Sequence, residues 1–98
     1  MGFEATGESS TLMMASELMM VSDQLRQARQ AAGMTQAEVA EQLFLTETYI
    51  RDMDSGDFHR LPKKVFVRGY LRSYARVVGL DGGQLVQLYD EAFWETLP

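Results

Sequence analysis

The chain has 98 residues, of which 46% are apolar and 23% are charged, and its formal net charge is −5. This length and composition suit one small folded domain rather than a disordered chain. The absence of cysteine excludes disulfides and thiolate metal sites, and the net negative charge argues against a general polyanion binder. No apolar run reaches the roughly 18–20 residues that a membrane-spanning helix needs.

The N-terminal part differs in composition from the rest. Residues 1–11 are rich in Gly, Ser, Thr and Glu, and residues 12–21 contain four of the seven methionines. We therefore predict a flexible, Met-rich extension over residues 1–21, of which residues 12–21 could form one or two helical turns or stay loose. A folded domain is predicted over residues 22–96.

The first helix is predicted over residues 22–32, because Ser22 or Asp23 can cap its start and Gly33 can end it. Its apolar residues recur at helical spacing, which indicates one buried face. These residues are Val21, Leu25, Ala28 and Ala32.

The second helix is predicted to start at Thr35, where "TQAE" matches a capping box between Thr35 and Glu38. Its buried face should contain Val39, Ala40 and Leu43. After a short turn at 44–46, Thr46 should cap a third helix that Gly56 ends. Its inward residues should be Tyr49, Ile50 and Met53.

A longer fourth helix is predicted between Pro62 and Gly79, and Asp81 should cap a fifth helix. The buried face of the fifth helix should contain Leu85, Leu88, Tyr89 and Phe93. No segment shows the alternation of apolar and polar residues that is typical of strands. The fold class is therefore predicted to be all-α, as a five-helix bundle.

The second and third helices are short and are joined by about three residues, which is typical of a helix-turn-helix. The stretch "LRQARQAAGMTQAEVAEQLFLTETYIRDMDSGDF" at 25–58 resembles the lambda-repressor-like (XRE-like) helix-turn-helix domain. The residues that carry this resemblance are Leu25, Ala28, Arg29, Gly33, Thr35, Gln36, Val39, Ala40, Leu43, Ile50 and Gly56. The resemblance implies the fold, but a fold alone does not define a function.

DNA-binding members of such families insert the third helix into the major groove. Residues 35–57 hold six acidic residues and one basic residue, and negative charge there should repel the phosphates of DNA. Sequence-specific DNA binding by a repressor-type regulator is therefore the alternative function, and DNA is an unlikely partner on this count. The candidate contacts for it are Gln36, Glu47, Thr48 and Arg51.

The fourth helix has two different faces. At about 100° per residue, a basic ridge of Arg68, Arg72 and Arg76 lies opposite a broad apolar arc, and Phe66 and Tyr70 fall at the edge of that arc. Aromatic anchors beside basic residues are typical of protein-binding surfaces. The ridge is also compatible with an anionic membrane surface.

The segment "FHRLPKKVFVRGYLRSYARVVGLD", with its elements "VFVRGYLRSYA" and "GLD", resembles the N-terminal cytoplasmic domain of the RodZ family of bacterial rod-shape proteins. The resemblance covers about residues 22–93. It implies a non-enzymatic cytoskeletal adaptor without a cofactor, whose partner is the actin-like filament protein MreB. It also implies a longer membrane-anchored protein, of which this chain would be a soluble, monomeric fragment at the cytoplasmic face of the bacterial inner membrane.

The same resemblance implies that Phe66 and Tyr70 bind MreB. We infer that Lys63, Lys64 and Arg68, which surround this pair in the sequence, act as steering charges.

Catalytic and metal sites are not indicated. The segment "DMDSGD" at 52–57 resembles the start of a calcium loop, but Gly56 stands at position 5 and Lys63 at position 12, where a Glu is expected. His59 is the single histidine. Ser55 and Asp57, which could complete a catalytic triad with it, lie on the same short connector and cannot converge on it from separate elements. No set of side chains therefore forms a recognisable catalytic group.

Overall fold

The structure is a computed structural model that describes the backbone of residues 6–61 and 64–96 and the side chains of residues 18–61 and 65–92. It confirms the all-α fold, since these residues contain helices and no strand. The five α-helices are α1 (Thr6–Ala31), α2 (Gln36–Leu43), α3 (Glu47–Ser55), α4 (Val67–Val78) and α5 (Gly82–Thr96). Two short 3-10 helices, η2 (Phe58–Arg60) and η3 (Lys64–Phe66), lie between α3 and α4.

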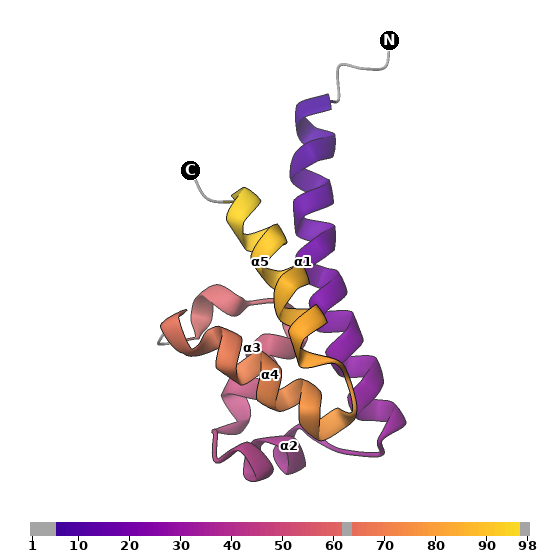
Figure 1. Cartoon of the computed structure of the whole chain (residues 1–98), viewed down its shortest axis with the longest axis vertical. Coiled ribbons are helices and arrows are strands. Elements are labelled where there is room, and N and C mark those ends of the chain that lie inside the picture. Colours follow the sequence, from indigo (N-terminus) through magenta and orange to yellow (C-terminus); the bar gives the residue numbers. More distant parts are fainter. Residues whose placement is uncertain (1–5, 62–63, 97–98) are drawn as a thin grey trace.

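The helix α1 forms the long axis of the bundle (Figure 1). The helix α5 runs antiparallel beside it, and α1 also packs on α3 and α4. The pair α2 and α3 lies at the end of the bundle opposite the start of α1 and the end of α5, and α4 crosses between this pair and α5. The helix-turn-helix pair is therefore held from two sides, by α1 and by α4.

Every α-helix contributes apolar side chains to one continuous core. The fully buried members are Val21, Leu25, Val39, Ile50, Met53, Val67, Leu71, Tyr74 and Ala75, and Leu85 and Tyr89 of α5 close the core. The predicted inward residues of the second and third helices are thus confirmed, with Leu43 and Tyr49 partly buried against the same core. Phe93 lies outside the described side chains.

The predicted helix boundaries are largely confirmed by the capping geometry. The Thr35 hydroxyl accepts a hydrogen bond from the Glu38 amide at 3.1 Å, and the Thr35 amide donates to the Glu38 carboxylate at 2.8 Å. The Asp81 carboxylate accepts from the Gln84 amide at 3.0 Å. Gly56 and Gly79 end α3 and α4 in the left-handed conformation, with φ of 80° and 86°.

The start of the first helix was predicted wrongly. The helix α1 begins at Thr6 rather than near residue 22, so residues 6–21 of the predicted extension are helical. Ser22 does not cap a helix, because it is fully buried and its hydroxyl donates to the Met53 carbonyl at 2.9 Å. Val21 is buried as predicted, whereas Ala32 is exposed in the turn that follows the helix.

Two threonines precede helices, and the structure gives them different roles. Thr35 caps α2 with its side chain, whereas Thr46 precedes α3 without a side-chain capping bond. We expect Thr35→Ala to lower the free energy of unfolding by about 1 kcal/mol, because a capping hydroxyl is lost. Thr46→Ala is the matched control and should change it much less. Urea denaturation measures the free energy of unfolding of both variants. Equal losses would contradict the conclusion that only Thr35 caps a helix with its side chain.

Candidate functional site

The fourth α-helix was predicted to follow Pro62, but α4 begins at Val67 and residues 64–66 form the 3-10 helix η3. Large apolar side chains are exposed where η3 meets α4. Val65 is 77% exposed and Phe66 is 49% exposed, while Tyr70 one turn later is partly buried. We call these three residues the aromatic edge. The buried side of α4 contributes Val67, Leu71, Tyr74, Ala75 and Val78 to the core. Phe66 precedes this helix and is only half buried.

Three aromatic rings connect this edge to the helix-turn-helix pair. The Tyr70 ring lies 6.3 Å from the Phe66 ring and 5.5 Å from the Tyr49 ring of α3, centroid to centroid. The second pair is edge-on, which is a favourable aromatic geometry. The sequence predicted Tyr49 as a core residue only; its contact with Tyr70 depends on how α3 and α4 pack, and no local pattern indicates it.

The charges around the aromatic edge differ from the predicted cluster. The Arg68 guanidinium donates to the Asp90 carboxylate of α5 at 2.7 Å, and both side chains are substantially exposed. Such a surface pair contributes little stability, but it neutralises one residue of the basic ridge. Lys63 lies outside the described residues, and Lys64 is described only by its backbone, as the first residue of η3.

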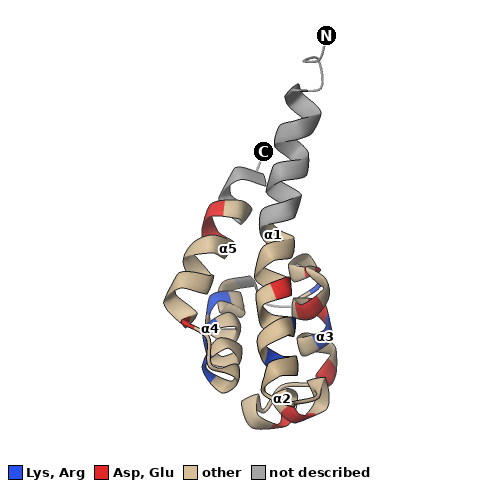
Figure 2. Cartoon of the chain, turned by 90° about the vertical axis from the view of Figure 1, so that its right-hand side faces the viewer, with Lys and Arg blue, Asp and Glu red and all other residues tan. Residues whose placement is uncertain are grey.

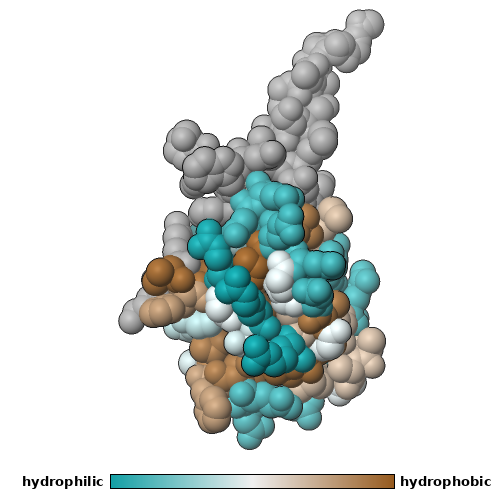
Figure 3. Space-filling view, in the orientation of Figure 1, coloured by the Kyte–Doolittle hydropathy of each residue, from teal (hydrophilic) through white to brown (hydrophobic). Residues whose placement is uncertain are grey.

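The rest of the ridge is exposed. Arg72 and Arg76 point away from the core and form no ion pair within the described side chains. A hydrophilic band crosses the α4 face of the molecule, with hydrophobic surface on either side of it (Figure 3). A membrane-binding role of this ridge stays a prediction, which now depends on two unpaired arginines rather than three.

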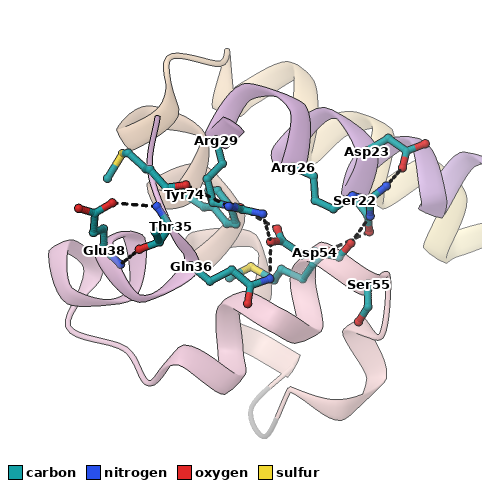
Figure 4. A network of polar contacts seen from close by, with 12 residues as sticks. Ser22, Asp23, Arg26, Arg29, Thr35, Gln36, Glu38, Asp54, Ser55 and Tyr74 are labelled. Atoms are coloured by element: carbon teal, nitrogen blue, oxygen red, sulfur yellow. Dashed lines mark hydrogen bonds and ion pairs between the residues drawn. The ribbon is translucent and has the colours of Figure 1, made fainter. Parts of the chain in front are cut away.

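Two of the three acidic residues of α3, Asp52 and Asp54, are buried rather than exposed. Asp54 is 3% exposed, and its carboxylate accepts hydrogen bonds from the Tyr74 hydroxyl at 2.7 Å and the Gln36 amide at 2.8 Å (Figure 4). The Arg29 guanidinium lies 3.2 Å from the same carboxylate and also donates to the Met34 carbonyl at 3.0 Å. The buried Asp54 carboxylate is thus both charge-paired and hydrogen-bonded, as burial requires.

Arg29 also donates to the Tyr74 hydroxyl at 3.2 Å. Burial raises the pKa of the Tyr74 phenol well above its usual value, and the hydrogen bond to Asp54 raises that pKa further. We call Arg29, Gln36, Asp54 and Tyr74 the Asp54 network. A second arginine, Arg26, donates to the Asp54 backbone carbonyl and to the Asp23 carboxylate.

The candidate DNA contacts separate into two groups. Gln36 is partly buried and bound to Asp54, whereas Glu47, Thr48 and Arg51 are all exposed on α3. Asp52, like Asp54, is buried. The exposed surface of α3 thus carries one Glu and one Arg, so it repels phosphates less than the sequence count indicated.

The described residues offer neither a metal site nor a membrane-spanning helix. They contain no group of three metal-ligating side chains that could hold an ion. None of their helices combines the length and the hydropathy that crossing a bilayer requires.

Comparison with known proteins agrees with this geometry. A family model described as a helix-turn-helix domain matches residues 24–85, which is more than half of the chain, so the protein belongs to this family. Among solved structures, it is similar to YmfM from Staphylococcus aureus, described as "a putative DNA-binding membrane protein", with a TM-score of 0.68 and 28% identity. That match covers 74% of this chain and 88% of the other.

The Asp54 network makes a prediction about stability. Tyr74→Phe removes a hydroxyl that donates to a buried carboxylate, so the free energy of unfolding should fall by about 1.5–3 kcal/mol. Tyr49→Phe removes an equivalent hydroxyl that makes no side-chain hydrogen bond within the described residues, and should cost less than about 0.5 kcal/mol. Equal values in urea denaturation would show that the Tyr74 hydroxyl does not bind Asp54.

The raised pKa of Tyr74 also predicts a pH dependence. An unfolded tyrosine loses its proton near pH 10, whereas the folded Tyr74 keeps it to higher pH. The stability linked to this proton is complete below about pH 10 and is lost as pH rises through the folded pKa. Tyr74→Phe should therefore reduce the alkaline loss of stability without abolishing it, since burial also raises the pKa of Tyr89. An unchanged alkaline profile, measured by thermal unfolding, would contradict this.

Proposed function

We propose that this helix-turn-helix domain is a non-enzymatic adaptor that binds a protein partner through the aromatic edge of α4. The observation that carries the proposal is the position of Phe66, which is half exposed at the end of η3, directly before α4, whose buried side contributes to the core. Large aromatic side chains at the centre of a docking surface supply most of the binding energy in many complexes.

The surroundings of Phe66 support a docking role. The partly buried Tyr70 and Tyr49 rings lie behind it in edge-on and tilted contacts. These contacts hold the rings in place before binding, so a partner would meet a surface that needs little ordering. Val65, which is 77% exposed, extends the apolar surface toward the start of η3.

We propose MreB as the partner, on the basis of the RodZ-like segment around "VFVRGYLRSYA". In that case the domain belongs to a longer, membrane-anchored protein and acts at the cytoplasmic face of the bacterial inner membrane in the control of cell shape. Phe66 and Tyr70 would be the anchors. Arg68 would act as a steering charge only in part, since Asp90 already neutralises it; Lys63 and Lys64 keep that role as a proposal.

Binding of MreB should depend on Phe66 more than on any other exposed aromatic. We expect Phe66→Ala to raise the dissociation constant at least roughly tenfold, as for an interface hot spot. Met20→Ala is the matched control, because it removes an equally exposed apolar side chain, 49% exposed on α1, that lies outside the aromatic edge. Binding is measured by co-sedimentation of the full chain with MreB filaments.

Thermal unfolding of both variants separates binding from folding. Phe66→Ala should leave the fold nearly as stable as the unmodified chain, because half of the ring is already in water. A large drop in Tm would mean that Phe66 is a core residue. Unchanged filament binding in a folded Phe66→Ala variant would refute the adaptor proposal.

DNA binding through α3 is the second candidate function. It is favoured by the burial of Asp52 and Asp54, which removes two acids from the exposed surface of α3, and by the likeness to YmfM. Thr48 and Arg51 would be its contacts, with Glu47 able to accept from a cytosine amine. Gln36 would first have to leave Asp54.

Fluorescence anisotropy with a labelled duplex tests this candidate. Binding should weaken steeply as salt is added, and Arg51→Ala should weaken it further, while Arg72→Ala on α4 is the matched control. An absence of binding at the lowest salt that keeps the protein folded would remove DNA from the functions of this domain.

A further inference from the structure

Phe44, in the turn between α2 and α3, is unusual in two independent respects. Its side chain is 94% exposed, and its backbone is left-handed, with φ of 56° and ψ of 38°. Among the described residues no other non-glycine residue has a positive φ. Glycine is the usual choice for this conformation, and a bulky residue there is an outlier. Strain of this kind is found most often where it serves a function.

The turn holds Phe44 in a defined position. The Phe44 amide donates to the Ala40 and Glu41 carbonyls at the end of α2, and the next residue, Leu45, packs against the core. The ring therefore projects from a fixed base, which suits an anchor that must be in place before its partner arrives.

Two carboxylates flank this ring in the chain. Glu41 lies three residues before Phe44 and Glu47 three residues after it, and both are exposed and without an ion pair among the described side chains. An aromatic ring attracts a guanidinium group over its face, and carboxylates pair with the same group. The chemical complement of this turn is therefore a pair of arginines.

The chain itself presents such a pair. Arg72 and Arg76 lie one helical turn apart on α4, exposed and unpaired, because Asp90 binds Arg68 alone. The basic segments of α4 and the acidic segments of α2 and α3 lie on different sides of the molecule (Figure 2). Since the Phe44 ring is almost fully exposed, it does not meet Arg72 or Arg76 of its own chain.

We propose that the turn formed by Glu41, Phe44 and Glu47 of one copy binds Arg72 and Arg76 of a second copy. The two surfaces differ, so the contact is heterologous and can repeat from copy to copy. One ring and two charge pairs form a small contact, well below the roughly 1,000 Å² expected of a stable interface. The association is therefore weak, and it operates where many copies are held close together.

Sedimentation velocity of the full chain over a wide concentration range tests this. The weight-average sedimentation coefficient should rise with concentration, and the rise should shrink at high salt, because exposed charges are screened. Phe44→Gly should abolish the rise while relieving the backbone strain, so the variant should fold at least as well. A coefficient that stays constant at every concentration would overturn the proposal.

Charge reversal gives the sharper test. The double variant Glu41→Arg/Glu47→Arg and the double variant Arg72→Glu/Arg76→Glu should each stay monomeric, because each repels its own copies. Their equimolar mixture should associate again, since opposite charges then meet between the two variants. Failure of the mixture to associate would contradict the proposal.

Two controls separate this contact from the other functions of α4. Phe66→Ala should leave self-association unchanged, because the proposed contact uses no residue of the aromatic edge. The unmodified chain is also mixed with vesicles of phosphatidylglycerol or of phosphatidylcholine. A monomer that binds only the acidic vesicles, and loses that binding with Arg72→Glu/Arg76→Glu, would assign the arginine pair to a lipid surface and refute the proposal.

Discussion

The Asp54 carboxylate accepts hydrogen bonds from Tyr74 of α4 and Gln36 of α2 and lies 3.2 Å from the Arg29 guanidinium of α1. One buried group of α3 thus contacts three other helices. Since a buried carboxylate is costly unless it is paired and hydrogen-bonded, each helix is held in the one arrangement that supplies a partner. The apolar core fills the volume, while this network fixes how α4 sits against the helix-turn-helix pair.

The position of α4 has direct consequences for the surface. With Tyr74 turned inward to Asp54, Tyr70 faces the Tyr49 ring of α3 and Phe66 is left half exposed at the edge. Because Asp54 is buried in this network, its charge is absent from the exposed surface of α3. The Gln36 side-chain amide donates to Asp54 and is therefore not available to a ligand. One internal constraint therefore shapes both the surface proposed for a protein partner and the surface proposed for DNA.

The sequence was sufficient to predict features that depend on neighbours along the chain. The capping box at Thr35 and the left-handed glycines at 56 and 79 are local signals with one physical solution each. The buried side of α4 followed from helical spacing. The same spacing placed Phe66 at the edge of the apolar arc, where the core could have covered it or left it open, and in the structure it is half exposed.

Other features depend on contacts between distant segments, and these could not be predicted. From the sequence alone Asp54 reads as a surface acid, because its partners are distant in the chain. Arg29 lies 25 residues before it and Tyr74 lies 20 residues after it. Arg68 looks like a free base until α5 places Asp90 beside it. Ser22 looks like a helix cap until Met53 offers a carbonyl. In each case the partner of a polar side chain lies far away in the chain, so no local pattern indicates the contact.

The central claim is that a protein partner docks on the aromatic edge, and titration of the isotope-labelled chain with MreB, followed by amide NMR signals, tests it most directly. The signals of residues 65–70 and of Tyr49 should shift or broaden first, while those of residues 47, 48 and 51 at the exposed start of α3 should stay unchanged. Changes confined to the exposed start of α3, or no change at any concentration of MreB, would contradict it.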